Sequence, residues 1–403
     1  MILKSEIKKA LEVQRKILLG KESYSERNEL DAISLSESHV LVVSGIRRCG
    51  KSTLLKMLIQ QINEKFVFLN FEDSRIFQFE LQDFSKLDEL VGEEVQYYFF
   101  DEIQNVENWE VYVRQLHEKG KKVFITGSNA SLLSKELGTR LTGRHINQEL
   151  FPFSYLEFIS FSKLKNNINS FEKYLKIGGF PEYIASENPE VLQNLMKDIV
   201  YRDIAVRYGI RNTKTLMDIT LHLLSNVGKE ITFNSLRKTF SVGSTNSVAD
   251  YLNWLEDCYL LFFLDRFSWS SKSIAINPRK VYGIDTGLIQ ANSLSFSENK
   301  GRLFENFVYL FLRQKPFTLF YFRENSECDF VVFEKKKCKM LIQVCEEVHL
   351  DNQDRETRGL LEAMNYFSME EGFIVTKNQQ DELRIDGKVI HLVPVIEWME
   401  NYF

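Results

Sequence analysis

The sequence predicts an α/β fold whose first part is a parallel β-sheet, and three observations support this class. Short apolar runs of strand length alternate with segments that have helical periodicity. A glycine-rich turn joins the first apolar run to the helix that follows it. Polar residues directly follow several runs, which places them at the carboxyl ends of strands, where open parallel sheets bind their ligands.

The period and length of the apolar runs assign the elements of this first part. The expected strands are residues 39–44, 66–71, 96–100, 122–126 and 146–150, and the expected helices are residues 53–65 and 109–119. Strands that alternate with helices predict a sheet covered on both faces. Residues 1–20 carry apolar groups among lysines at helical spacing. They predict an amphipathic helix that packs on its own domain or serves as a basic arm for membranes or nucleic acid.

The turn at residues 45–52 matches G-x-x-x-x-G-K-[ST], a loop that binds phosphates. Gly45 and Gly50 let the backbone turn tightly, and N–H groups at the start of the next helix attract the anion. Lys51 would reach the terminal phosphates, and Ser52 would hold magnesium. A chance glycine turn is the alternative, which the flanking strand and helix disfavour. The expected nucleotide-binding residues are Gly45, Ile46, Arg47, Arg48, Cys49, Gly50, Lys51, Ser52 and Thr53.

An acidic pair, Asp101 and Glu102, follows the apolar run 96–100. At a strand end beside bound phosphates, Asp101 would hold magnesium directly or through water. Glu102 would activate or orient the attacking water, a task that suits a carboxylate once other water is excluded. An acidic pair can also simply cap a strand, but the phosphate-binding loop upstream favours catalysis.

The next expected strand ends in Thr126-Gly-Ser-Asn129, a set of small polar residues. Asn129 or Ser128 would sense the terminal phosphate and position the attacking water. Small polar turns are also ordinary loop chemistry, which is the alternative for these residues.

Two arginines, Arg140 and Arg144, follow in a glycine-punctuated loop. A guanidinium can stabilise the charge on a transferring phosphoryl group, as an arginine finger does. For Arg140, a solvated surface loop is an equally good interpretation. Arg144 is the better candidate because Gly143 precedes it and because it leads into the expected strand 146–150. The sequence leaves open whether the finger acts within one chain or across a subunit boundary.

Several motifs occur together in one order. In the first part they are residues 45–52, Asp101-Glu-Ile-Gln104, Thr126-Gly-Ser-Asn129, Thr142-Gly-Arg144 and Phe151-Pro-Phe-Ser-Tyr-Leu-Glu-Phe158. They continue at residues 178–182, 201–203, 278–282, 285–288, 301–310, 321–323 and 329–330. This set resembles prokaryotic AAA-type ATPases that carry a C-terminal domain related to restriction-endonuclease folds. The resemblance covers nearly the whole chain and implies ATP as ligand, magnesium as cofactor and a helical lid after the ATPase core.

The element pattern and the resemblance together predict four segments. Residues 1–150 would form the ATPase core with its N-terminal helix, residues 151–212 a helical lid, residues 213–275 a winged helix-turn-helix, and residues 276–403 a nuclease-like α/β domain. In the winged-helix segment, the third helix would enter the DNA major groove in a DNA-binding version. No lysine or arginine occurs from residue 246 to 264, so a structural or protein-contact role is the favoured alternative.

The last segment has the helix and strand order of a restriction-endonuclease core. An active centre of that kind needs two carboxylates for metal and a lysine for the water. Glu305 and Asp329 stand where acids are needed, but Gln343 and Cys345 replace the remaining glutamate and lysine. Unless Glu346 or Glu347 substitutes, this centre is expected to be catalytically degenerate.

Composition sets further limits. The net charge of -5 gives no general footprint for nucleic acid, so such binding would need a local patch. Five scattered cysteines without a C-x-x-C motif fit a reducing cytoplasm and argue against a disulfide framework or a zinc module. No apolar run reaches about 18 residues, and the N-terminus lacks the apolar core of a signal peptide. A cytoplasmic protein without a membrane partner is therefore expected.

The expected function is magnesium-dependent binding and hydrolysis of ATP, coupled to conformational change in C-terminal modules that hold a partner. One alternative is an ATP-gated nuclease that acts on DNA. The other is a nucleotide-dependent binding scaffold that hydrolyses little ATP. The sequence leaves open whether the partner is DNA or protein, and whether the chain forms a homo-oligomer.

Overall fold

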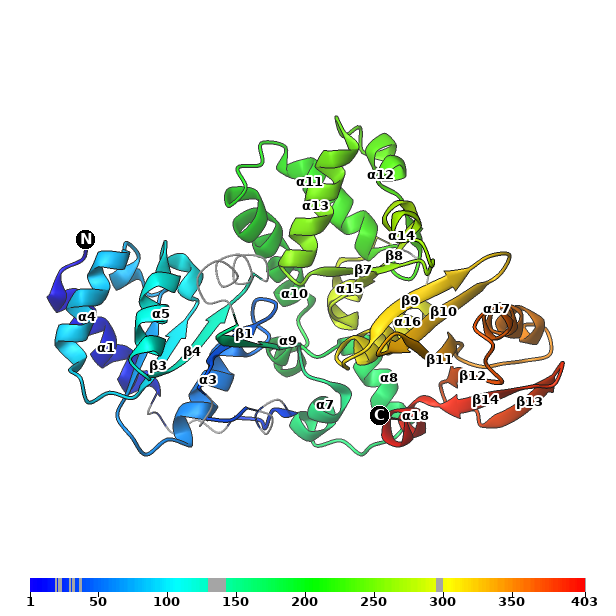
Figure 1. The fold of residues 1–403 in the computed structure, drawn as a ribbon, viewed down its shortest axis with the longest axis horizontal. Helices are drawn as coiled ribbons and strands as arrows, with labels where there is room; N and C mark the ends of the chain where they lie inside the picture. The colour runs from blue at the N-terminus through cyan, green and yellow to red at the C-terminus, as the bar shows by residue number, and fades with distance from the viewer. Residues whose placement is uncertain are drawn as a thin grey trace. The chain divides into compact units, whose positions relative to one another are not determined.

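A computed structural model describes residues 1–403 except residues 19, 21–23, 29, 31–32, 36–37, 130–142, 295–299 and 403. The chain divides into two compact units (Figure 1). The first unit comprises residues 1–162 and the short segment 257–259, and the second comprises residues 163–256 and 260–403. Within the described ranges, no helix is both long and apolar enough to cross a membrane.

The first unit contains a sheet of five strands in the order β2-β3-β4-β1-β5. Its strands are β1 (Val40–Ser44), β2 (Phe66–Asn70), β3 (Tyr97–Asp101), β4 (Lys122–Gly127) and β5 (His145–Glu149). All of these pairings are parallel, so the carboxyl ends of the strands lie at one end of the sheet. The predicted α/β class with a parallel sheet is confirmed.

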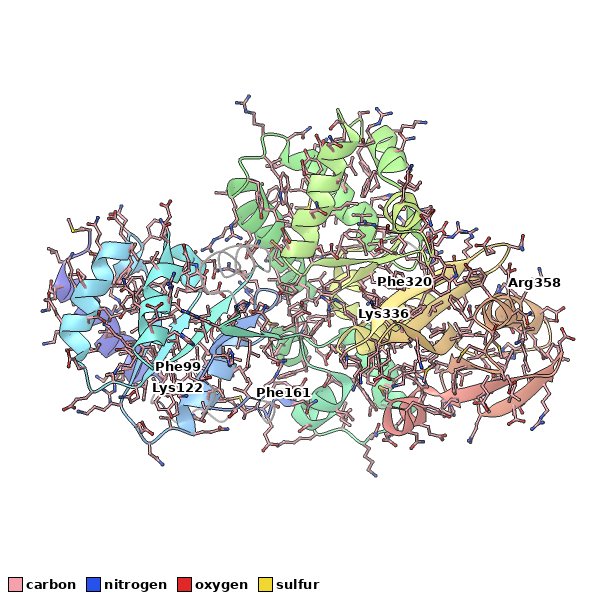
Figure 2. The ribbon with its side chains drawn as sticks, viewed as in Figure 1. Phe99, Lys122, Phe161, Phe320, Lys336 and Arg358 are labelled. Carbon is pink, nitrogen blue, oxygen red and sulfur yellow. The ribbon has the colours of Figure 1, made fainter. Side chains whose placement is uncertain are left out.

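Helices cover both faces of this sheet, as the alternation of strands and helices predicts. One face shares a core with helices α1 (Lys4–Leu18), α4 (Phe84–Val91) and α5 (Trp109–Glu118). The amphipathic helix expected near the N-terminus therefore packs on its own unit. Helix α3 (Lys51–Gln60) covers the other face, so that β3 and β4 lie between α5 and α3 in Figure 1. On that second face Phe99, labelled in Figure 2, is fully buried and stacks on Phe124 with ring centroids 4.7 Å apart.

Helices and a small sheet make up the first half of the second unit. The helices are α8 (Ile168–Ile177), α9 (Pro181–Ser186), α10 (Pro189–Asp198), the π-helix η4 (Ile199–Val206), α11 (Thr213–Leu224), α12 (Phe233–Thr239) and α13 (Thr245–Asp257). Strands β6 (Glu230–Ile231), β7 (Leu261–Asp265) and β8 (Arg279–Gly283) form a sheet in the order β6-β8-β7. The elements from α11 to β7 occur in the predicted order, and their assignment as a winged helix stays a prediction. Strand β8 completes their sheet although it lies beyond the boundary expected at residue 275, and helix α7 (Tyr155–Ser162), expected in the lid, lies in the first unit.

The last part of the second unit is a sheet of six strands in the order β13-β14-β12-β11-β10-β9. The strands are β9 (Thr318–Arg323), β10 (Glu327–Glu334), β11 (Lys337–Val344), β12 (Glu371–Thr376), β13 (Asp381–Ile385) and β14 (Lys388–Pro394). The remaining helices are α14 (Ser271–Ile276), α15 (Thr286–Asn292), α16 (Lys300–Arg313), α17 (Gln353–Tyr366) and α18 (Val395–Asn401). The sequence pattern missed β13 and β14.

A close backbone contact joins α15 to the end of α8. The Asp285 carboxylate caps α15, accepting the Leu288 N–H at 2.8 Å, and it also accepts the Gly179 N–H at 2.6 Å. A Cβ atom at Gly287 would lie 1.8 Å from the carbonyl oxygen of Ile177. This position therefore requires glycine for close approach, and so does Gly178, where a Cβ would lie 2.3 Å from Asp285 Oδ1. These contacts give a physical reason for one glycine in each of the motifs at 178–182 and 285–288.

We expect Gly287→Ala to lower the free energy of unfolding by about 3 kcal/mol, because the added methyl group would overlap backbone that is held on both sides. Thermal unfolding followed by circular dichroism measures the change. Gly243→Ala is the matched control, because a Cβ at Gly243 meets no atom within 4 Å. Equal unfolding midpoints in the two variants would contradict the assigned contact.

Candidate functional site

The glycine-rich turn lies between β1 and α3, at the carboxyl end of the parallel sheet. A Cβ at Gly45 would lie 2.2 Å from the carbonyl oxygen of Leu150, and Gly50 has a φ of +108°. Both glycines are therefore required by the local backbone, one for close approach and the other for its left-handed conformation. Helix α3 begins at Lys51, two residues earlier than expected, because the end of the motif forms its first turn.

The side chain of Lys51 is folded into this loop and is 4% exposed. Its ammonium donates to the carbonyl oxygens of Gly45 at 3.0 Å and Ile46 at 3.1 Å, and it lies 3.5 Å from the Glu102 carboxylate. Burial acts to lower the pKa of Lys51, but the nearby Glu102 carboxylate outweighs it and the pKa lies above its usual value. Lys51 therefore brings a full positive charge into the loop.

Asp101 is completely buried at the end of β3. Its carboxylate accepts hydrogen bonds from Thr126 Oγ1 at 2.6 Å and from Asn70 Nδ2 at 2.7 Å, and the Ser52 hydroxyl also bonds to it. Burial raises the pKa of Asp101 to about 6, aided by the negative charge of Glu102, while the bonds from Thr126 and Ser52 act in the opposite direction. A buried carboxylate and a hydroxyl, both hard oxygen ligands, fit a magnesium ion.

Glu102 follows in a left-handed conformation, with a φ of +53°. Its N–H donates to Thr126 Oγ1 at 2.9 Å, and its carboxylate accepts from Gln104 Nε2 at 2.6 Å. Burial alone would raise the pKa of Glu102, but the charge of Lys51 and the bond from Gln104 hold it below its usual value. Glu102 is therefore ionised, and its unusual backbone is of the kind that concentrates at functional sites.

The polar residues at the end of β4 and directly after it are buried. Thr126 anchors both acidic residues, since its hydroxyl donates to Asp101 and accepts from the Glu102 N–H. Ser128 Oγ lies 3.5 Å from Gln104 Nε2, and Asn129 Nδ2 donates to Cys258 Sγ at 3.7 Å. Cys258 belongs to the segment 257–259 that the first unit includes.

Arg144 lies at the opposite end of the sheet. It directly precedes β5, and its carbonyl oxygen accepts the N–H of Val40, the first residue of β1. The five residues of β1 span roughly 16 Å, so the whole strand separates Arg144 from the loop at residue 45. The side chain of Arg144 is 45% exposed, and its guanidinium lies 3.2 Å from the Glu118 carboxylate of α5. Arg140 lies outside the described residues.

The other expected loop residues have different surroundings. Ile46 and Cys49 are buried, and the Cys49 thiol donates to the carbonyl oxygen of Leu150 at 3.3 Å. Arg47 pairs with Glu72 at 2.8 Å. Arg48 is exposed with a left-handed φ of +63°, and Thr53 is half-buried in the first turn of α3.

Sequence reasoning missed three residues of this site. Asn70, which holds Asp101, ends β2 as Asp101 ends β3, so its place at a strand end was the available signal. Gln104 lies in the motif at residues 101–104, but the motif does not indicate its bond to the Glu102 carboxylate. Arg27 is buried, donates to the Phe151 carbonyl oxygen at 2.7 Å and the Cys49 carbonyl oxygen at 3.4 Å, and pairs with Glu157 at 3.2 Å. Its partners lie far away in the sequence, so no local pattern indicates it.

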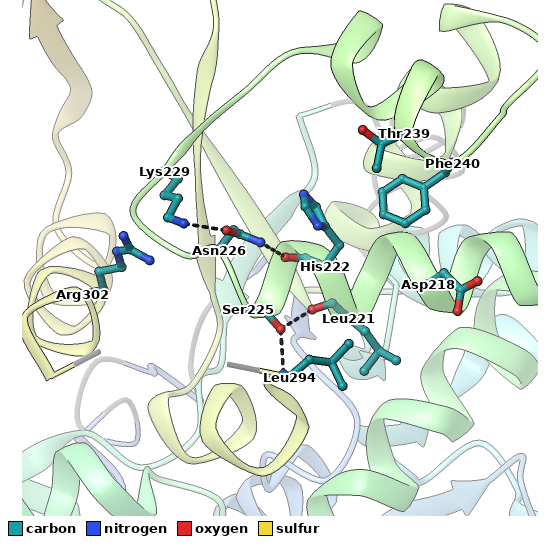
Figure 3. Close-up of a pocket in the computed structure, with 10 residues that line it drawn as sticks. All are labelled: Asp218, Leu221, His222, Ser225, Asn226, Lys229, Thr239, Phe240, Leu294 and Arg302. Carbon is teal, nitrogen blue, oxygen red and sulfur yellow. Dashed lines mark hydrogen bonds between the residues drawn. The ribbon is translucent and has the colours of Figure 1, made fainter. Parts of the chain in front are cut away.

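Of two hollows in the structure, one reaches the candidate site residues and the other does not. A cavity of about 330 Å³ in the first unit is lined by Ser52, Asn70 and Asp101 and by side chains of α1, so it reaches the expected metal ligands. A hollow of about 720 Å³ in the second unit lies along α11 (Figure 3). There, Lys229 Nζ donates to Asn226 Oδ1, and Asn226 Nδ2 donates to the His222 carbonyl oxygen, both at 2.8 Å. These polar groups bond to one another, and none of them belongs to an expected site.

In the segment predicted to be nuclease-like, Glu305 and Asp329 both contact the ammonium of Lys280. Gln343 bonds to the Asp329 N–H and to Glu356, and Cys345 donates to the Glu347 carbonyl oxygen. Among the residues that the structure describes, no group of three acidic, histidine or cysteine side chains is arranged to hold a metal ion.

Comparisons with known proteins support an AAA-type domain in the first unit. The family described as an AAA domain matches residues 37–159, and a domain of unknown function (DUF8612) matches residues 168–299. The uncharacterized protein MJ1544 of Methanocaldococcus jannaschii is 36% identical, over 92% of this chain and 90% of its own length. An uncharacterized protein of Haemophilus influenzae is 28% identical, over 89% of this chain and 94% of its own length.

Among solved structures, Cdc6p from Pyrobaculum aerophilum is 13% identical with a TM-score of 0.28, covering 68% of this chain and 95% of that one. A score this low carries no argument about function. The AAA-type part of the expected resemblance is confirmed by the domain match, whereas the relation to restriction endonucleases stays a prediction. This chain is 36% identical to MJ1544 over most of both sequences and has an AAA-type P-loop ATPase domain at residues 37–159. The chain therefore belongs to the family of that uncharacterized protein.

Proposed function

We propose that the protein is a magnesium-dependent ATPase whose hydrolysis cycle changes how its second unit holds a partner. The observation that carries this proposal is one cluster at the carboxyl end of the sheet, formed by the buried Lys51, Asp101 and Glu102 and the half-buried Ser52. These are the residue types that P-loop enzymes use for phosphate, magnesium and attacking water.

The roles follow from the contacts. Backbone N–H groups of the loop and the Lys51 ammonium bind the phosphates, and Ser52 and Asp101 hold magnesium. When bound, magnesium neutralises charge on the phosphate oxygens. Glu102 orients the attacking water and accepts its proton. Because Lys51 pairs with Glu102 in this structure, phosphate competes for the ammonium and releases the Glu102 carboxylate for that task.

Arg144 completes the proposed site from a second copy of the chain. Its position at the amino end of β5 separates it from its own loop, whereas its exposed guanidinium is accessible to a neighbouring subunit. An arginine supplied by a partner stabilises charge on the transferring phosphoryl group. We therefore infer that the active form is a homo-oligomer.

The segment 257–259 offers a route between nucleotide and the second unit. The Tyr259 hydroxyl donates to Ser44 Oγ at 2.7 Å, directly before the phosphate loop, and Cys258 accepts from Asn129. The same segment is covalently continuous with β7 of the second unit and with α13, whose residues before Asp257 belong to the second unit. We infer that changes at Ser44 and Asn129 during the cycle pass along the chain to those elements.

Titration with ATP and magnesium tests nucleotide binding, on which the whole proposal depends. We expect Lys51→Ala to weaken ATP binding about tenfold or more, because a charged hydrogen bond contributes about 1.5–3 kcal/mol. Isothermal titration calorimetry measures the affinity, and Lys65→Ala, which removes an exposed lysine beyond α3, is the control. The proposal fails if the folded wild-type protein shows no measurable affinity for ATP with magnesium.

A further inference from the structure

The second unit contains three carboxylates gathered around one buried ammonium. Lys280 lies on β8 and is 1% exposed. Its Nζ lies 2.7 Å from Glu327 Oε1, 2.9 Å from Asp329 Oδ1 and 3.0 Å from Glu305 Oε1. An ammonium has three donors, so these three carboxylates match its full hydrogen-bonding capacity.

Neighbouring groups hold the carboxylates in place. The Tyr282 hydroxyl donates to Glu305 Oε1 at 2.7 Å, and the Val344 N–H donates to Asp329 Oδ2 at 3.0 Å. The three acids come from α16 and β10, while Lys280 comes from the small sheet of β6, β7 and β8. The positions of the carboxylate oxygens are therefore set by the fold around them and not by Lys280 alone.

The cluster has more negative than positive charge. Three carboxylates face one ammonium, and the nearby Arg323 is 45% exposed and 3.8 Å from Glu327. Burial raises the pKa of Glu305 to about 7, and the charge of Asp329 adds to this, although Lys280 acts to lower it. Burial would lower the pKa of Lys280, but Asp329 and Glu305 hold it well above its usual value. The ammonium therefore stays charged, and without it the buried acids would have to take up protons or another cation.

An ammonium and a metal ion would compete for the same oxygen atoms. Ca²⁺ binds carboxylate oxygens at about 2.3–2.6 Å and Mg²⁺ at about 2.1 Å. The oxygens around Lys280 Nζ lie at 2.7–3.0 Å, so they would move inward by a few tenths of an ångström for Ca²⁺ and by more for Mg²⁺. Ca²⁺, which accepts flexible coordination, is thus the closer match.

We propose that Lys280 is a built-in cation whose ammonium takes the place of a divalent metal ion among Glu305, Glu327 and Asp329. In the native protein the site binds no metal ion, and removal of the ammonium opens it to Ca²⁺. This inference goes beyond the proposed ATPase function and does not depend on it. It also gives the nuclease-like segment a second reason, besides the replacements at Gln343 and Cys345, to lack metal-dependent chemistry.

Calorimetric titration of the full-length chain with Ca²⁺, in the absence of nucleotide, tests the proposal. Lys280→Met keeps most of the aliphatic volume and removes the charge. We expect this variant to bind about one Ca²⁺ per chain. The wild type is expected to bind no Ca²⁺ at this site, so its titration should match that of Asp329→Asn. The matched control is Lys280→Met combined with Asp329→Asn, which removes one of the three carboxylates and is expected to lose the binding.

Lys280→Met leaves buried carboxylates unpaired, so its folding is measured as well. We expect Ca²⁺ to raise its thermal midpoint relative to EDTA and to leave the wild-type midpoint unchanged. If Lys280→Met does not fold in EDTA, recovery of its circular dichroism with Ca²⁺ supports the proposal, and failure to recover overturns it. A folded Lys280→Met that binds no Ca²⁺ overturns it too, as does wild-type Ca²⁺ binding that Asp329→Asn abolishes.

Discussion

Replacing Glu102 with glutamine is expected to lower ATP turnover by about 10²–10⁴-fold while ATP stays bound, because a positioned general base contributes about that factor. Glutamine keeps the shape of the side chain but cannot take a proton from water. It also removes the ion pair with Lys51, which competes with phosphate for the ammonium. We therefore expect ATP affinity at least as high as in the wild type.

Two measurements separate these effects: phosphate release reports turnover, and nucleotide retained after desalting reports binding. Glu107→Gln is the control, because Glu107 is an exposed residue close in the sequence to the same strand end. Turnover in Glu102→Gln at the level of this control would contradict the role given to Glu102. Loss of both turnover and binding would instead indicate that Glu102 supports the fold of the loop.

Arg144→Ala is expected to lower turnover by about 10³-fold or more without weakening ATP binding, because an arginine finger acts on the transition state. The matched control is Arg114→Ala. Arg114 pairs with Glu118 at 2.9 Å, as Arg144 does at 3.2 Å, so both variants lose an exposed ion pair to the same carboxylate. Loss of turnover in Arg144→Ala but not in Arg114→Ala separates catalysis from surface electrostatics.

Mixing two inactive variants tests whether Arg144 acts between subunits. A Lys51→Ala subunit retains Arg144, and an Arg144→Ala subunit retains an intact phosphate loop, so mixed oligomers contain complete sites. We expect the mixture to recover part of the turnover that each variant lacks. Absence of recovery in assembled mixtures, or a wild-type protein that hydrolyses ATP as a monomer at every concentration, would rule out action between subunits.

The sequence predicted helices and strands well where the apolar pattern of the segment was clear. Strands β1 to β5 were all expected within about two residues of their observed ends. For β1 to β4 the reason is that buried parallel strands are continuous apolar runs bounded by polar residues, whereas β5 is a more polar, partly exposed edge strand. Helix α4 and strands β13 and β14 were not expected. Strand β13 is an edge strand with mostly exposed residues, so it lacks the apolar signal of a buried strand.

The candidate site could be predicted only where its residues are close in sequence or share a position at strand ends. The motif 45–52 and the pair Asp101 and Glu102 have such signals, and the structure places Lys51, Ser52 and both acids together. Arg27 had no such signal, because its bonding partners Cys49 and Phe151 lie 22 and 124 residues away in the sequence. The geometry of Arg144 also depends on strand direction, since parallel pairing puts it at the amino end of β5.

By itself, the sequence determined the class of the first unit, the phosphate loop and the residue types that meet there, because glycine backbone freedom and apolar periodicity act over a few neighbouring residues. The tertiary structure decided which distant side chains meet. It brought Asn70 to Asp101 through pairing of β2 with β3, and Lys280 to Glu305 and Asp329 through packing of separate elements. Such contacts are stabilised by burial and charge between segments far apart in the chain, and no local pattern encodes them.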